Sequence, residues 1–127
     1  MALYYNLAKV YDISESDQEF VLQIAELFVI DIPQDMIQLK LNIDNKDYKT
    51  AYAFAHKIKP TLDLFGMTVA VEETICIENW TKNQGKRREI IETYKNLHDR
   101  ITKAVKEISK NLVPHLIPKR DVDGKPK

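Results

Sequence analysis

The chain has 127 residues, 44% of them hydrophobic, with only three glycines and five prolines. This length is typical of one domain, and it can bury about two-thirds of the surface that the unfolded chain exposes. Lysine plus arginine equals aspartate plus glutamate at 19 each, so no net charge favours nucleic acid or an anionic membrane as a partner.

Cysteine content and hydropathy bear on whether the protein is secreted, membrane-bound or cytoplasmic. The single cysteine, Cys76, cannot form an internal disulfide. No apolar run is long enough to cross a bilayer, and the first residues lack the basic region and apolar core of a signal peptide. The sequence therefore predicts a cytoplasmic globular protein.

The first predicted elements are a short helix and a long one. The short amphipathic helix spans residues 3–11, with one face formed by Tyr4, Leu7, Ala8 and Tyr11. The motif SDQE then predicts a capping box in which Ser16 is the N-cap and Glu19 reaches back to it. In the long helix that follows, Pro33 predicts a kink or break, after which the helix continues to about residues 41–43.

The third predicted helix spans residues 46–65, with Asp44 or Asn45 as its N-cap. Gly66 follows its last turn, where glycine commonly ends a helix. The residues expected to be buried recur at helical spacing: Tyr48, Ala51, Ala55, Ile58, Leu62 and Phe65.

The segment VAVEETICIENWTKN, residues 69–83, is ambiguous because its β-branched residues partly alternate, as in a strand. No second strand is available to pair with it, so we predict a helix capped by Thr68. Gly85 marks a turn, and the longest periodic pattern follows over residues 86–112, ended by Pro114.

Four long helices joined by short connections predict an all-α fold, specifically an antiparallel up-and-down four-helix bundle with the short first helix packed at one end. This domain spans residues 1–113. The tail, residues 114–127, has no apolar residues that repeat with a period and is predicted to be disordered.

His56 is expected outside the core. A helix advances about 100° per residue, which puts His56 roughly 130° from the centre of the buried stripe of the third helix. The same side of this helix carries Tyr52, Lys59, Pro60 and Asp63. Geometry alone favours an ordinary surface histidine on a bundle that serves as an interaction module.

The stretch AHKIKPTLDLFG, residues 55–66, resembles the phospho-accepting signature of histidine-containing phosphotransfer (HPt) domains. The matching features are Ala-His, an apolar residue two positions later, lysine next, then glycine or proline, and a glycine ten residues after the histidine. These positions are Ala55, His56, Ile58, Lys59, Pro60 and Gly66. The order of helices over residues 3–112 is similar to that family as well.

The resemblance implies a phosphocarrier in a two-component phosphorelay. His56 would accept a phosphoryl group from a receiver-domain aspartyl phosphate and pass it to another receiver, so the chain would not be an enzyme on its own. Lys59, one helical turn away, would screen the phosphoryl charge. Lys57 lies on another side of the helix and could help only if its side chain wraps back.

Other positions have roles by the same resemblance. Glu78 occupies the place where some family members carry a glutamate or glutamine that orients the imidazole, although a solvated glutamate is an equal alternative. Tyr52, Pro60 and Asp63 would lie on the partner-docking strip, with Pro60 leaving room for a receiver beside the histidine. Asp63 is read as a solvated charge or as a partner of Lys59, and Gly66 as structural.

The implied partners are a receiver domain of a hybrid histidine kinase, a response regulator, or both. Mg²⁺ is expected in the partner receiver, with no cofactor in this chain. His98 and His115 lack metal-ligand spacing, so no metal site is expected. A monomer is expected. The alternative function is a non-phosphorylated helical adaptor that keeps the same fold and binds partners without transfer.

Overall fold

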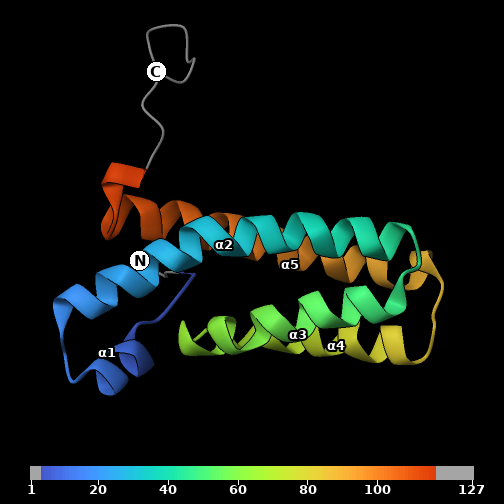
Figure 1. Cartoon of the computed structure of the whole chain (residues 1–127), viewed down its shortest axis with the longest axis horizontal. Helices are drawn as coiled ribbons and strands as arrows, with labels where there is room; N and C mark the ends of the chain where they lie inside the picture. Colours follow the sequence, from blue (N-terminus) through green and yellow to red (C-terminus); the bar gives the residue numbers. More distant parts are fainter. Residues whose placement is uncertain (1–3, 117–127) are drawn as a thin grey trace, which may run out of the picture.

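The computed structural model describes residues 4–116, and this part of the chain is all-α, as predicted (Figure 1). The elements are α1 (Ala8–Ser14), α2 (Gln18–Asp44), α3 (Tyr48–Leu64), α4 (Thr68–Lys82), α5 (Arg87–Asn111) and a 3-10 turn, η1 (Pro114–Leu116). Helices α2 and α4 each pack against both α3 and α5, while α1 contacts α2. The predicted disordered tail lies outside the described residues, except for its first three residues, which form η1.

The helix predicted over residues 3–11 begins later, at Ala8. The preceding backbone is bonded to other elements instead of to itself: the Tyr4 N–H donates to Glu107 Oε1 at 2.7 Å and the Asn6 N–H donates to the Phe65 carbonyl at 2.7 Å. Asn6 Oδ1 then accepts from the Ala8 N–H, so the helix starts there. The buried residues of this region are Tyr5 and Val10. Of the predicted face, Leu7 and Tyr11 pack against the core while partly buried, whereas Tyr4 and Ala8 are exposed.

Helix α2 continues through Pro33 without a break, which corrects the alternative of an interrupted helix. Proline removes one backbone donor, and the remaining hydrogen bonds and the buried face hold the helix together. Figure 1 shows the ribbon bending between its blue first half and its cyan second half. The N-cap is Asp17, whose carboxylate accepts from the Glu19 and Phe20 N–H groups, so the prediction of Ser16 was wrong by one residue.

Helix α3 begins after its N-cap Asp47, which accepts from the Thr50 N–H at 3.1 Å, rather than after Asp44 or Asn45. Asp44 is the last residue of α2 and pairs instead with Lys40 at 2.7 Å. The predicted buried stripe of α3 is confirmed except at Tyr48, which is half-buried.

The ambiguous segment is a helix, α4, and its N-cap is Met67 rather than Thr68. Its β-branched residues divide between the two faces: Thr74 and Ile77 are buried, whereas Val69 and Ile75 are exposed. Helix α5 follows the predicted periodicity closely, and its Tyr94 hydroxyl donates to the Met36 carbonyl of α2 at 2.9 Å.

Gly66 ends α3 in the left-handed region, with φ of 67°. Its N–H donates to the Asp63 carbonyl and the Met67 N–H donates to the Leu62 carbonyl, the pair of bonds that defines a Schellman motif. A Cβ at this position would lie 2.7 Å from the Asn6 Cβ. Gly66 therefore meets two requirements, a positive φ and close approach of the N-terminal segment.

Replacing Gly66 with Ala should lower the free energy of unfolding by at least about 1–2 kcal/mol, because an L-residue is strained in the left-handed region. Urea denaturation of the two proteins measures the loss. In an Asn6→Gly background the same substitution should cost less, since the steric part is relieved. An equal cost in both backgrounds would show that the close approach contributes nothing.

Candidate functional site

Helix α3 presents His56 to solvent. The residue before it, Ala55, is fully buried against the other helices, and one step along a helix rotates the next side chain by about 100°. The His56 side chain is accordingly 60% exposed. Its predicted position outside the core is confirmed.

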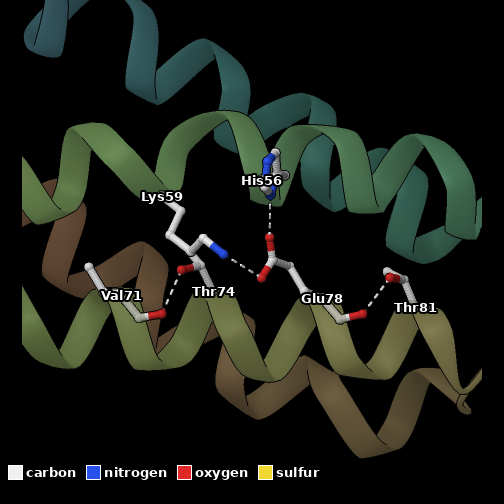
Figure 2. A network of polar contacts seen from close by, with 6 residues as sticks. All are labelled: His56, Lys59, Val71, Thr74, Glu78 and Thr81. Carbon is white, nitrogen blue, oxygen red and sulfur yellow. Dashed lines mark hydrogen bonds and ion pairs between the residues drawn. The ribbon is translucent and has the colours of Figure 1, made fainter.

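One nitrogen of the imidazole is held from α4. His56 Nδ1 lies 2.9 Å from Glu78 Oε2, and Lys59 Nζ donates to the other carboxylate oxygen, Oε1, at 2.8 Å. Figure 2 shows the two α3 side chains reaching the same carboxylate from adjacent turns. The Glu78 side chain is only 7% exposed, so the structure places it in the imidazole contact rather than in solvent.

The charge of Glu78 decides the tautomer of the histidine. Burial would raise the pKa of this carboxyl, but the hydrogen bonds from Lys59 and His56 outweigh burial and leave the pKa below its ordinary value. An ionised carboxylate only accepts hydrogen bonds, so Nδ1 of a neutral imidazole must carry the proton. The lone pair is then on Nε2, which points away from Glu78.

The face of the imidazole is also restrained. The Tyr52 ring, one turn earlier on α3, stacks on it with centroids 5.5 Å apart and an interplanar angle of 12°. Lys82 Nζ of α4 lies 5.5 Å from the centre of the Tyr52 ring. The sequence placed Tyr52 on this side but did not indicate the stacking or Lys82; the spacing of four residues between Tyr52 and His56 was the available signal.

Helix α4 carries Glu78 between two threonines whose hydroxyls are satisfied within the helix. Thr74 Oγ1 donates to the Val71 carbonyl and Thr81 Oγ1 to the Glu78 carbonyl, both at 2.6 Å (Figure 2). Both threonines are buried. They fill the α3–α4 contact without adding a competing donor to the carboxylate.

The other predicted site residues are not all brought together. Lys57 points to α2 and donates to Asp35 Oδ1 at 2.9 Å, so it does not reach His56. Asp63 is exposed, in line with the expected solvated charge, but it pairs with Lys9 of α1 at 3.0 Å rather than with Lys59. Pro60 is exposed one turn beyond His56, inside a continuous helix.

The remaining histidines lie elsewhere. His98 stacks on Tyr94, and His115 lies 3.8 Å from Glu26. Within residues 4–116 no three His, Cys, Asp or Glu side chains form a group that could hold a metal ion. Nor does any helix of this range have both the length and the apolar character of a membrane span.

No family model, curated protein or solved structure matches this chain.

Glu78→Gln should reduce the free energy of unfolding at neutral pH by about 1–3 kcal/mol, because one of its two α3 donors loses an acceptor in a buried place. The pKa of Glu78 is lowered in the folded state, so this stabilisation is complete above its ordinary value of 4.5 and is lost as pH falls through the lower, folded value. Urea denaturation across this pH range should show the two proteins converging in acid.

The matched control is Glu72→Gln, which changes an exposed glutamate of the same helix. It should leave the unfolding free energy nearly unchanged at every pH. A wild-type advantage over Glu78→Gln that stays constant on acidification would contradict an ionised, buried Glu78.

Proposed function

We propose that this protein is a histidine phosphotransfer protein of a two-component phosphorelay. His56 accepts a phosphoryl group from a receiver-domain aspartyl phosphate and passes it to another receiver. The partners are a hybrid histidine kinase, a response regulator, or both, in the cytoplasm. The chain is a phosphocarrier, and the receiver supplies Mg²⁺ and completes the chemistry.

The proposed fold is an antiparallel up-and-down four-helix bundle. Two observations support it: α2 and α4 each pack against both α3 and α5, and the connections 45–47, 65–67 and 83–86 are short. In this arrangement α3 and α4 are neighbours, as the contact between His56 and Glu78 requires.

The observation that carries the functional proposal is the placement of the imidazole. A phospho-accepting histidine needs an exposed, neutral nitrogen that a receiver can approach in line. The buried Glu78 carboxylate holds Nδ1 as a donor at 2.9 Å, and the side chain is 60% exposed. This arrangement leaves the Nε2 lone pair as the nucleophile.

The transfer step needs only His56, Glu78 and the aspartyl phosphate of the receiver. The Nε2 lone pair attacks phosphorus, the acyl-phosphate P–O bond breaks, and its electron pair returns to the receiver aspartate as a carboxylate. The proton stays on Nδ1, where the Glu78 carboxylate offsets the positive charge that develops on the ring. The Lys59 ammonium donates to Glu78 Oε1 and has two further N–H groups, so its proposed role is to offset the phosphoryl charge from one turn away.

The alternative, a non-phosphorylated adaptor, is favoured by no specific contact. An adaptor needs an exposed surface but has no use for a carboxylate buried against one imidazole nitrogen, because burying a charge costs free energy unless it is paired. Glu78 serves the chemistry of His56 more directly than it would serve docking.

The deciding experiment is phosphoryl transfer from a panel of phosphorylated receiver domains to wild type and His56→Gln. We expect a label that is labile in acid and stable in alkali, as a phosphoramidate is, on the wild type only. His98→Gln is the matched control and should label like the wild type. Receivers that bind both proteins equally while labelling neither would favour the adaptor.

Pro60 tests the need for room beside the histidine. Pro60→Arg restores a helical donor, so it should not weaken folding, but its long side chain should obstruct a docking receiver and slow transfer by at least about tenfold. Pro60→Gly is the matched control, because it removes bulk rather than adding it, and should keep the wild-type rate. Equal rates for all three proteins, measured by rapid quench, would remove the steric argument.

A further inference from the structure

The outer face of α2 carries an apolar stripe that no other part of residues 4–116 covers. Four of the eight large hydrophobic side chains exposed in this range belong to this helix: Leu27 at 54%, Ile30 at 45%, Ile37 at 66% and Leu41 at 50%. A surface helix usually has one apolar face, directed at the core. Helix α2 has that face as well, with Phe28, Ile32 and Leu39 almost fully buried.

The spacing of the outer residues is that of a coiled coil. Leu27, Ile30, Gln34, Ile37 and Leu41 follow one another at intervals of three, four, three and four, the a and d positions of two heptads. None of the five is charged. We refer to these five residues as the α2 seam.

We propose that the α2 seam pairs with the same seam of a second copy of this chain, with the two helices antiparallel. Reversing the direction of one seam can set Leu27 opposite Ile37 of the other chain, and the same register sets Ile30 opposite Gln34. Apolar side chains therefore meet at both ends of this stretch. This proposal is independent of phosphoryl transfer and replaces the expectation of a monomer.

The charges beside the seam favour the antiparallel orientation. Glu26 and Lys40 flank it on one side and are each partly exposed. In an antiparallel pair this flank lies beside the same flank of the other chain, running in the opposite direction. Glu26 of each chain therefore meets Lys40 of the other. A parallel pair would bring Glu26 of each chain against Asp31 of the other, two repulsive carboxylate pairs, whereas the antiparallel pair has one, between the two Asp31 side chains.

The shape of the surface beside the seam supports close packing. A hollow of about 240 Å³ lies between α2 and α5 and is lined by Pro33, Met36, Ile37, His98, Ile101, Thr102 and Val105. Coiled-coil packing inserts side chains of one helix into spaces between those of the other. The hollow offers such a space next to the most exposed residue of the seam.

The seam and His56 lie on different sides of the molecule. Helix α2 packs against α3 and α5, as α4 does, so the outer face of α2 points away from α4 and from the contact between His56 and Glu78. At its Leu27 end the seam reaches a hollow that Lys57 and Thr61 of α3 also line, so self-association is measured on the chain without a receiver. Self-association and phosphoryl transfer are then tested separately.

The test is sedimentation equilibrium of the full chain over a concentration series. Wild type should rise from 14.8 kDa toward twice that mass. Ile37→Lys should weaken the dimer by at least about tenfold, since it puts a charge into the buried centre of the interface. Ile13→Lys is the matched control: Ile13 is 65% exposed but belongs to α1, and its variant should dimerise like the wild type.

Orientation is tested by charge reversal. Glu26→Lys and Lys40→Glu should each weaken the dimer severalfold, and the double variant should restore it. A tighter dimer with Glu26→Lys alone would indicate the parallel pair and overturn the proposed orientation. The proposal as a whole is overturned by a wild type that stays monomeric throughout, by equal losses for Ile37→Lys and Ile13→Lys, or by a monomer whose receiver binding depends on Ile37.

Discussion

Glu78 keeps a charged carboxylate at the contact between α3 and α4, and this charge must be satisfied where water hardly reaches it. Both donors come from α3: His56 and Lys59 are three residues apart, so they project from adjacent turns toward the same partner. Satisfying the carboxylate therefore defines how α3 is rotated against α4. The exposed imidazole, its protonated Nδ1 and the placement of Tyr52 all depend on that rotation. Small residues on the inner side of α3, Ala51 and Ala55, are compatible with it because both are fully buried.

The helical turns of α3 before and after His56 surround the imidazole differently. Four residues earlier, Tyr52 closes one face of the ring by stacking; four residues later, Pro60 presents little bulk and is exposed. A helix proline removes the donor for one carbonyl, here that of His56, and near an exposed side chain water can replace it. The proline that looks costly in the sequence therefore stands where the cost is small, and it leaves the open space beside His56 that the proposed transfer requires. Glu78 orients the imidazole through Nδ1 and Tyr52 covers one face of the ring, while the side chain stays 60% exposed.

Helix periodicity predicted the all-α fold, the four long helices and the exposure of His56, because each depends on which face of a single helix is apolar. Helix starts were less predictable: Asp17 and Asp47 act as N-caps although Ser16 and Asp44 were equally good candidates by type, and the choice depends on where the preceding chain turns. Apart from the contact of Glu78 with His56, which the family resemblance implied, the partners of the charged site residues were not predicted. Lys57 meets Asp35 and Asp63 meets Lys9, and these contacts exist only once α2 and α1 have packed. The late start of α1 has the same origin, since Asn6 binds the end of α3.

Helix α2 shows that one helix can carry two apolar faces of different period. Its inner residues, from Val21 to Ile43, recur at close to the 3.6-residue repeat of a straight helix packed in a globular core, whereas the α2 seam repeats every 3.5 residues. Packing within one chain accounts for the inner apolar face of α2 but not for the exposed seam. An exposed seam of this length is an aggregation hazard unless a defined partner covers it, and the proposed second copy would cover it. Because α2 lies diagonally from α4 in the packing, the proposed dimer surface faces away from the contact between His56 and Glu78, while its Leu27 end adjoins Lys57 of α3.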